Sequence, residues 1–249
     1  MWVLFDFDMN RGWRGRIGII YPADGLIEDE FYRFVPEGVA IHLTRITVPA
    51  EKLSLNVVAY VAETTEIEQA AKMLTITRPN VIAYACTSGS FLKKGYEKEI
   101  SERIKKAAGV PAITTTEAVL DAFDFLKIKR VIVVAPYPED INNQLRIYLQ
   151  EAGLKIIAFK GLELNSEWEI GNFSPWNLYT ECKEVFKDDA DGLFIPCTGL
   201  RTAEIIDALE KDLGKPVITA NQATMWKALQ LMKIREPVCG VGTLLKQPR

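Results

Sequence analysis

The sequence is poor in the side chains that most often bind metals or form disulfide frameworks. It has one histidine and four cysteines in 249 residues, and no two cysteines are spaced as Cys-x-x-Cys. Structural zinc sites and dithiol redox centres usually need such a pair, and a disulfide framework needs more cysteine. The sequence therefore predicts reduced thiols, no metal site and a cytoplasmic protein.

Neither an excess of one charge nor a long apolar run is present. The chain has 30 basic and 33 acidic side chains, a formal charge of −3, and no basic cluster that would indicate nucleic acid or an anionic membrane. No apolar run approaches the roughly 18 residues of a membrane-spanning helix. The N-terminal MWVLFDFDMNRGWRG has acids within its apolar part and lacks a signal-peptide layout. We expect neither a nucleic-acid partner nor a membrane.

Short β-rich runs alternate with amphipathic helical patterns along the whole chain. Helices are expected at Tyr96–Ala108 and Thr202–Leu213, each followed by a glycine. Near-continuous apolar strands that alternate with helices are typical of parallel sheets covered on both faces. The expected strands are Arg16–Ile20, Asn56–Val61, Asn80–Ala85, Ala112–Thr114, Arg130–Ala135, Lys155–Lys160, Gly192–Pro196 and Val217–Thr219.

Three blocks occur twice in the same order. The matched pairs are Tyr21-Pro22 with Tyr137-Pro138, Cys86-Thr87 with Cys197-Thr198, and residues 111–118 with 216–223. Such internal repetition predicts an α/β protein of two pseudo-symmetric lobes, each a four-stranded parallel sheet flanked by helices. The first lobe is expected at residues 1–120, with the segment 226–249 packing back on it, and the second at residues 121–225.

All three repeated blocks follow predicted strands, where open parallel sheets bind their ligands. We therefore expect Cys86 and Cys197 on opposite walls of an interlobe cleft. Each thiol is expected beside a helix N-terminus, whose dipole and free N–H groups favour a thiolate. The N–H groups of Thr87, Ser88, Thr198 and Gly199 are suited to hold a carboxylate or an enolate-like oxyanion.

Each of these features also has a purely structural interpretation. Cysteine is often only a small buried hydrophobe, and Cys182 and Cys239 fit that interpretation. A Tyr-Pro pair can simply end a strand, although the Tyr137 hydroxyl is also placed to donate to a ligand. His42 is expected to be a strand residue, and Arg45 either a solvated strand residue or a carboxylate ligand.

The motifs together resemble those of a known family. They are RIGII leading to Pro22, ACTSGSF, APYPEDIN with Tyr137 and Asn142 in register, IPCTGLRT and PVITANQATMW. From about residue 13 to 245 the chain resembles the aspartate/glutamate racemase superfamily, and within it the maleate cis–trans isomerase and arylmalonate decarboxylase branch. The racemases typically have Cys-Asn-Thr at both cysteines, and the decarboxylases have glycine at the position of Cys86. Because this chain has both thiols, each followed by threonine, its motifs resemble those of the isomerases more than those of the racemases or decarboxylases.

The resemblance implies cofactor-free chemistry on a small carboxylic acid. The residue that matches Cys197 adds to a double bond in maleate isomerases, and rotation and elimination then give the trans diacid. The residue that matches Cys86 assists, whereas in racemases the two thiols act as base and acid. The implied substrate-binding residues are Thr87, Ser88, Tyr137, Asn142, Thr198, Gly199 and Asp24. Resembling proteins are commonly homo-oligomers.

Two positions depart from the isomerase pattern. Maleate isomerases usually have an asparagine that touches substrate after Pro-Ser-Ser, where this chain has Pro22-Ala23-Asp24. In the second lobe an asparagine also gives way to an acid, Glu167, with Asn165 two positions earlier. Carboxylates at both places would repel a dianionic substrate unless they are turned away or paired.

Three further interpretations stay open at this point. Racemisation and an arylmalonate-type decarboxylation are the alternatives to isomerisation. A two-lobed protein that binds a small anion without reacting is the alternative from another class, although such proteins are usually exported and need no paired cysteines. A thiol-redox role would need a closer pair of cysteines. Alkylation separates these, because a catalytic thiolate reacts fast near neutral pH.

Overall fold

Two parallel four-stranded sheets form the framework of the protein. The computed structural model describes residues 11–246, and ten residues of the N-terminal segment discussed above lie outside them. The first sheet has the order β2-β1-β3-β4 and the second β6-β5-β7-β8, with every pairing parallel, so the predicted pair of matching lobes is confirmed. The strands are β1 Gly15–Pro22, β2 Val39–Ile46, β3 Val81–Tyr84, β4 Ala112–Thr114, β5 Arg130–Ala135, β6 Lys155–Gly161, β7 Gly192–Ile195 and β8 Val217–Thr219.

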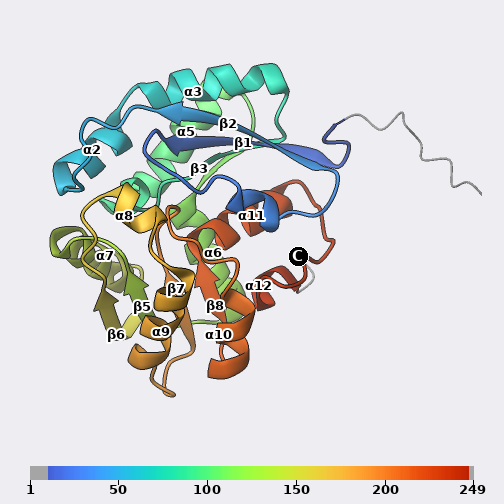
Figure 1. Cartoon of the computed structure of the whole chain (residues 1–249). Coiled ribbons are helices and arrows are strands. Elements are labelled where there is room, and N and C mark those ends of the chain that lie inside the picture. The colour runs from blue at the N-terminus through green and yellow to red at the C-terminus, as the bar shows by residue number, and fades with distance from the viewer. Residues whose placement is uncertain (1–10, 247–249) are drawn as a thin grey trace, which may run out of the picture.

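Helices flank both sheets, and α6, α8 and α11 lie between the lobes (Figure 1). In the first half of the chain the helices are α1 Glu30–Arg33, α2 Leu55–Glu63, α3 Glu66–Leu74, α4 Thr87–Phe91, α5 Tyr96–Ala108 and α6 Thr115–Leu126, with a 3-10 turn at Thr75–Thr77. In the second half they are α7 Glu139–Glu151, α8 Glu167–Gly171, α9 Pro175–Val185, α10 Ile206–Leu213, α11 Ala220–Leu231 and α12 Thr243–Lys246.

One expected strand is wrong, because residues 56–61 belong to helix α2 and the missing strand is β2. The valines of this segment favour a strand by their β-branching, but the buried residues Val57, Val58, Val61 and Ala62 share one helical face. Ser54 caps the helix by accepting a hydrogen bond from the backbone N–H of Val57 at 3.4 Å. The spacing of the buried residues and the Ser54 cap together favour a helix over a strand.

The pseudo-symmetry extends to the helix that follows the last strand of each lobe. Thr114 with Glu117 at the start of α6, and Thr219 with Gln222 at the start of α11, form the same reciprocal capping box. The two helices pack against each other, and α11 also contacts β3 and β4 of the first sheet while α6 contacts β8 of the second. Each lobe therefore shares its last helix with the other, which couples the two sheets mechanically.

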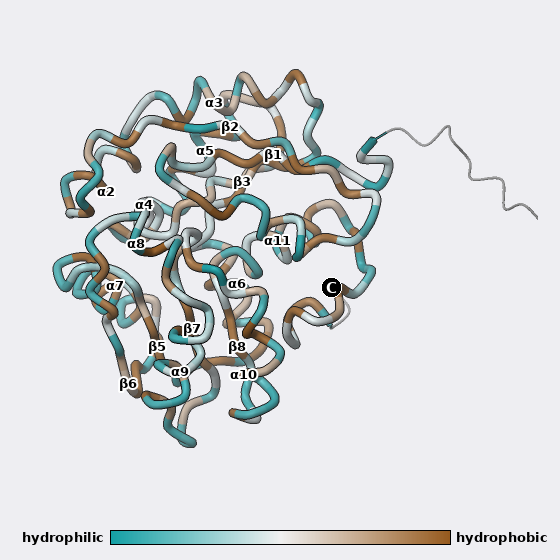
Figure 2. The backbone as a smooth tube through the Cα atoms, in the orientation of Figure 1, coloured by the Kyte–Doolittle hydropathy of each residue, from teal (hydrophilic) through white to brown (hydrophobic). Residues whose placement is uncertain are grey.

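The hydrophobic core follows the strands and the two shared helices. Figure 2 shows hydrophobic residues along β1 and β8, inside the helical layers. Ile17 and Ile19 of β1, Val133 of β5 and Phe194 of β7 are fully or almost fully buried, and so is Trp226 of α11. The core thus continues from one lobe into the other through α11.

The segment after α11 contacts both lobes. Glu236 forms an ion pair with Arg14 at the start of the first sheet. Further along, Thr243 donates its backbone N–H to Glu210 of α10 at 2.7 Å, and Lys246 pairs with Asp207 at 2.9 Å. The lobe boundary near residue 120, and the assignment of residues 226–249 to the first lobe, stay predictions.

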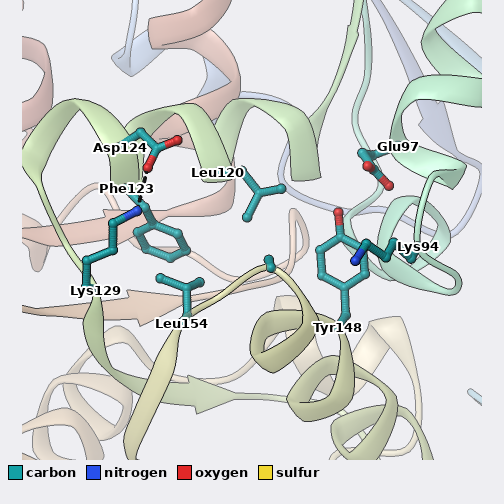
Figure 3. A pocket seen from close by; sticks show the side chains of 9 residues that line it. Lys94, Glu97, Leu120, Phe123, Asp124, Lys129, Tyr148 and Leu154 are labelled. Carbon is teal, nitrogen blue, oxygen red and sulfur yellow. Dashed lines mark hydrogen bonds and ion pairs between the residues drawn. The ribbon is translucent and has the colours of Figure 1, made fainter.

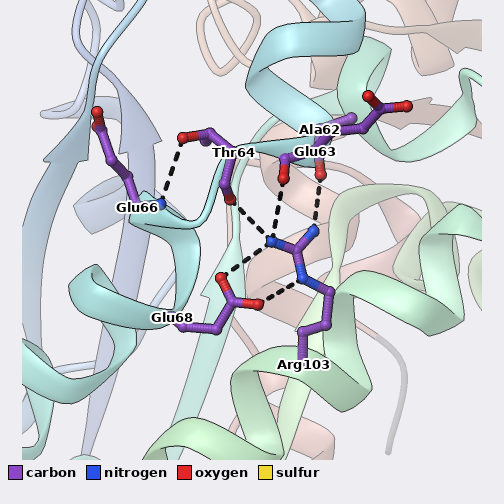
Figure 4. A network of polar contacts seen from close by, with 6 residues as sticks. All are labelled: Ala62, Glu63, Thr64, Glu66, Glu68 and Arg103. Atoms are coloured by element: carbon purple, nitrogen blue, oxygen red, sulfur yellow. Dashed lines mark hydrogen bonds and ion pairs between the residues drawn. The ribbon is translucent and has the colours of Figure 1, made fainter.

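Arg103 of α5 joins three elements of the first lobe (Figure 4). Its guanidinium donates to both carboxylate oxygens of Glu68 on α3, at 2.7 and 2.9 Å, and to the carbonyls of Ala62 and Thr64 at the end of α2, at 3.0 and 2.8 Å. A cation at a helix C-terminus satisfies carbonyls that have no partner within the helix. The arginine also holds the pKa of Glu68 below its usual range.

We expect the change Arg103→Met to lower the free energy of unfolding by about 1–3 kcal/mol, because charge-assisted hydrogen bonds from a half-buried group are lost. Urea denaturation at pH 7 measures this. The loss should shrink as pH falls through the lowered pKa of Glu68, since the stability from a depressed carboxyl pKa is present only above it. Lys105→Met, which removes the exposed pair with Glu102, is the control and should change almost nothing.

Candidate active site

The two repeated cysteines lie at the facing ends of β3 and β7. Cys86 occupies the N-cap position of α4, and Cys197 follows β7 directly; only 8% and 5% of their surfaces are exposed. The Thr198 hydroxyl donates to the carbonyl of Ala85 at 3.1 Å, so the two strand ends meet across the lobes. The thiols interact electrostatically with each other.

Cys197 has a backbone conformation that only glycine adopts easily. Its φ is +81°, a left-handed value that costs a side-chain-bearing residue on the order of 1–3 kcal/mol unless its surroundings hold it. The carbonyl of the next residue, Thr198, accepts hydrogen bonds from the Tyr21 hydroxyl at 2.9 Å and from Asn221 Nδ2 at 3.2 Å. In this turn the Gly199 N–H donates to Cys197 Sγ at 3.3 Å. The strain thus places a donor against the sulfur.

Glu30 of α1 holds the same turn from the first lobe. It is 3% exposed and accepts hydrogen bonds from the backbone N–H groups of Thr202 and Ala203, from the Thr202 hydroxyl, and from Asn221 Nδ2 at 2.5 Å. Sequence reasoning missed Glu30, Asn221 and the contact of Tyr21 with the turn. Tyr21 and Asn221 do fall within the repeated blocks, whereas Glu30 carries no local signal.

The helix expected after Cys197 begins later than predicted. Residues 198–205 form turns, and α10 starts only at Ile206. The reason is Glu30, which binds the N–H groups of Thr202 and Ala203 and so holds this stretch as an irregular loop. The expectation of a helix N-terminus beside the second thiol is therefore wrong, whereas α4 does begin beside Cys86.

Both site thiols are protonated at neutral pH in the protein as described, contrary to the expected thiolates. Burial raises the pKa of Cys86 to about 11, although the Gly89 N–H and the Ser88 hydroxyl oppose this. Burial, and then the carboxyl of Glu167, raise the pKa of Cys197 well above its ordinary value; the Gly199 N–H and the Tyr137 hydroxyl oppose them. A proton acceptor is needed before either sulfur can act as a nucleophile.

We therefore expect iodoacetamide at pH 7.5 to label Cys239 first, because Cys239 is exposed and the other three cysteines are buried. The interpretation of Cys239 as a buried hydrophobe is wrong, whereas Cys182 fits it, with a pKa raised by burial in α9. Peptide mass spectrometry over time gives the order of labelling. Faster labelling of Cys86 or Cys197 than of Cys239 would contradict the raised thiol pKa values.

Glu167, the first residue of α8, is the acid nearest to Cys197. Its Oε1 lies 4.0 Å from Cys197 Sγ, and its residue is half-buried while the carboxyl end is desolvated. Burial first, and then the charge of Asp24, raise the pKa of Glu167 to about 8. A Cβ at Gly199 would stand 2.3 Å from Glu167 Oε2, so glycine leaves the carboxyl its place. Glu167 is thus positioned to exchange a proton with the thiol.

Asp24 lies in the turn after β1, where Arg45 holds the backbone. Arg45 donates to the carbonyls of Pro22 and Gly25, at 2.9 and 2.6 Å, and pairs with Glu28 at 2.7 Å. Arg45 lies on β2 with a partly exposed side chain, as the strand interpretation expects, and its binding to a carboxylate ligand stays a prediction. Burial raises the pKa of Asp24, and within the described part of the chain its Oδ1 has no hydrogen-bond partner. His42 lies on β2, as expected.

Two buried hydroxyls beside the thiols have no hydrogen-bond partner among residues 11–246, those of Thr87 and Tyr137. The Tyr137 ring packs edge-on against Phe91, and its hydroxyl interacts electrostatically with both thiols without meeting hydrogen-bond geometry. Ser88 Oγ lies 3.7 Å from Cys86 Sγ. A buried hydroxyl without a partner is costly, so these groups are suited to a bound ligand.

Two predicted ligand residues are engaged in protein contacts instead. Asn142 Nδ2 donates to the carbonyl of Tyr137 at 2.5 Å, which fixes the turn that carries the tyrosine. The hydroxyl and the carbonyl of Thr198 are both used between the lobes, as described above. Asn142 and Thr198 therefore position their neighbours, and the substrate-binding role predicted for them stays a prediction.

A separate cavity of about 180 Å³ lies where α5 and α6 face α7 (Figure 3). Lys94, Glu97, Phe123 and Tyr148 are among its lining residues, and no predicted site residue lines it. It holds no nucleophile, so the thiol pair defines the candidate site. Within residues 11–246 no three potential metal ligands cluster, and no helix there has the length and apolarity to span a membrane.

The fold and the site define a two-lobed α/β protein with a pair of opposed, buried thiols. The family model for arylmalonate decarboxylase matches residues 17–245, so the chain belongs to that family. Maleate isomerase from Pseudomonas putida is 25% identical over 241 residues, 92% of this chain and 96% of the relative. Arylmalonate decarboxylase from Bordetella bronchiseptica is 26% identical over 219 residues, 86% and 88% of the two chains.

Solved structures agree with this assignment. A maleate isomerase from Pseudomonas putida S16, crystallised with maleate, superposes with a TM-score of 0.87 at 25% identity and covers 93% of this chain and 97% of its own. A Nocardia farcinica maleate cis-trans isomerase with a covalently bound succinylcysteine intermediate shares the fold, with a TM-score of 0.86, 20% identity and 94% and 99% coverage. The predicted family, and the prediction of an enzyme, are confirmed.

Proposed function

We propose that this enzyme is a cofactor-independent isomerase that converts a small cis-unsaturated carboxylic acid to its trans isomer. The observation that carries the proposal is the thiol pair: Cys86 and Cys197 are buried at facing strand ends, beside hydroxyls that have no hydrogen-bond partner among the described residues. Relatives named maleate isomerase support the reaction type. Neither an arylmalonate-type decarboxylation nor simple anion binding calls for two opposed thiols.

The reaction begins with proton transfer from Cys197 to the carboxylate of Glu167, across the 4.0 Å between them. The sulfur then forms a C–S bond to one alkene carbon, and the π electron pair moves onto the conjugated acyl group as an enolate-type anion. The N–H and O–H donors near Thr87 and Tyr137, and the Cys86 S–H, stabilise that anion. The anion takes over the negative charge of the thiolate, and only the π bond of the alkene is broken in this step.

Rotation about the new single bond then brings the substituents to the trans arrangement. The electron pair returns to re-form the double bond, the C–S bond breaks, and the departing sulfur recovers its proton from Glu167. The protein ends in its initial protonation state, and because the substrate undergoes no net oxidation or reduction, the scheme requires no redox cofactor. We include a homo-oligomeric assembly in the proposal, and light scattering of the purified protein tests it.

A two-base racemase is the second candidate, because two thiols on opposite sides of one carbon are also what that reaction needs. Proton NMR in D₂O separates the candidates with a panel of maleate, its monoamide, methyl-substituted maleates, aspartate, glutamate and an arylmalonate. Appearance of a trans-alkene signal that is lost in Cys197→Ala supports isomerisation. Deuterium at Cα with loss of optical purity supports racemisation, and loss of a carboxyl group supports decarboxylation.

A further inference from the structure

The acids at positions 24 and 167 give the site an electrostatic character that a dianion does not fit. Glu167 lies beside Cys197, and its carboxyl interacts with that of Asp24. The groups that most shift the pKa of Cys197 are Glu167, Gly199, Tyr137 and Cys86, and none is a cation. Arg45, the arginine that interacts with Asp24, is bound to Glu28 and to backbone carbonyls. A second substrate carboxylate placed at the acid pair would be repelled by Asp24 and, above pH 8 where it is ionised, by Glu167 as well.

The hydroxyl donors of the site are those of Thr87 and Ser88, beside Cys86, and that of Tyr137, which interacts more with Cys197 than with Cys86. Thr87 and Ser88 follow Cys86 directly, and the Tyr137 ring packs on Phe91 of the same short helix. The hydroxyls of Thr87 and Tyr137 are buried and lack partners within residues 11–246. One substrate carboxylate is therefore satisfied by these hydroxyls, whereas the acid pair offers mainly acceptors, among them the Oδ1 of Asp24, which is buried and has no partner in the described part of the chain.

We infer that the substrate carries one carboxylate and, at its other end, a group that donates N–H hydrogen bonds to Asp24 and Glu167. The inference rests on the proposed function and narrows its substrate class. Primary amides and ammonium groups both supply such donors, and the monoamide of a cis-butenedioic acid combines the amide with an activated double bond. In that compound the amide also accepts the electron pair when Cys197 adds.

Gly199 supports the assignment independently of charge. A Cβ at this position would overlap Glu167 Oε2, so the chain keeps space for a carboxyl directly over the Cys197 turn. Glu167 is also the first residue of α8, held in place by the Ser166 cap and by the backbone hydrogen bond from Leu53 to Asn165 at 2.8 Å. The acid is built into the site and is not a surface side chain that happens to reach it.

Saturated analogues test the inference without any chemistry. Isothermal titration calorimetry at pH 9, where Glu167 is ionised, compares succinate, its monoamide succinamate, and 4-aminobutanoate, which differ only in the group at one end. We expect succinate to bind at least tenfold more weakly than one of the other two, and which of these binds identifies amide or ammonium. In the double variant Asp24→Asn, Glu167→Gln, succinate should gain at least tenfold. Glu184→Gln, an exposed acid on α9, is the matched charge control and should leave all three affinities unchanged.

Two outcomes overturn the inference. One is succinate binding as tightly as both other analogues, or more tightly, and the other is no binding by any of them. Turnover of maleate and maleamate is measured by proton NMR in an experiment separate from the binding measurements. Maleate converted as fast as maleamate contradicts the inference while it supports the proposed isomerase. Selective binding of succinamate without isomerisation of either alkene supports the inference and contradicts the proposed reaction.

Discussion

Replacing Cys197 by alanine should lower kcat/KM for the isomerised substrate by on the order of 10³-fold or more, because in the proposed scheme its sulfur is the group that bonds to the alkene carbon. The Cys197→Ser variant should lose nearly as much, since a serine hydroxyl is far harder to deprotonate than a thiol. Cys86→Ala should retain more activity than either, because in the proposed scheme Cys86 stabilises the anion without bonding to carbon. Initial rates by proton NMR at pH 8 give all three values.

The control for the Cys197 variants is Cys239→Ser, which changes an exposed thiol outside the site and should keep full activity. Serine and alanine are also compared for thermal unfolding, because the left-handed backbone at this position is strained for any of the three residues. Retention of more than a tenth of the activity by folded Cys197→Ala would refute its role as the nucleophile. Equal losses in Cys86→Ala and Cys197→Ala would instead favour the two-base scheme.

Most of the fold was predictable because its strands are short, apolar and flanked by turn residues. Among the expected strands only the segment 56–61 was misassigned, because its β-branched residues occur with helical spacing; strand β2 was missed, and the helix after Cys197 starts later than expected. The repeats made the two-lobe arrangement predictable, since matched blocks imply matched strand orders. The exchange of α6 and α11 between lobes leaves no such mark in the sequence.

The site was predictable at its centre and not at its supports. Cys86, Cys197, Thr87 and Tyr137 lie in repeated motifs at strand ends. The residues that hold them occupy matching positions in the two lobes but differ in side chain. Thr116 donates to the carbonyl of Thr87 at 3.4 Å, and at the matching position Asn221 donates to the carbonyl of Thr198 at 3.2 Å. Interlobe contacts such as those of Glu30 depend on how the lobes dock, which no local pattern encodes.

The pKa values of the two thiols were also not predictable from the sequence. A cysteine before a helix suggests a thiolate, but the helix after Cys197 does not start there, and burial outweighs the N–H groups at both sulfurs. The site instead pairs a buried, protonated thiol with a carboxyl of raised pKa. In the proposed scheme the sulfur becomes nucleophilic only when Glu167 accepts its proton. The proton inventory of the site therefore includes two thiols and two acids.

The pH dependence of turnover should follow Glu167. Its pKa, raised to about 8, means that the acceptor form is scarce at pH 6 and predominates above pH 8. For an uncharged-amide substrate we expect kcat/KM to rise about tenfold per pH unit below pH 8 and to level off above it. Rates between pH 6 and 9.5, in buffers of constant ionic strength, measure the inflection.

The groups that face Glu167 predict how the inflection moves. Asp24 raises the pKa of Glu167, so Asp24→Asn should shift the inflection below pH 8. Cys197, Tyr21, Tyr137 and Cys86 also interact with it, but all four have raised pKa values and stay neutral in this range. In Glu167→Gln the inflection at pH 8 should disappear. An unchanged inflection in that variant would mean that another group accepts the thiol proton.

The pH dependence of protein stability gives a second test of the raised pKa of Glu167. A carboxyl whose pKa is raised on folding binds its proton more tightly in the folded protein, so it costs no stability below its unfolded pKa, near 4.5, and costs progressively more up to pH 8. Glu167→Gln removes that cost. Its Tm should match the wild type at pH 4.5 and exceed it increasingly up to pH 8, with no further change above. Activity lost and stability gained in one variant, over the same pH interval, would identify Glu167 as an acid buried for function at the expense of stability.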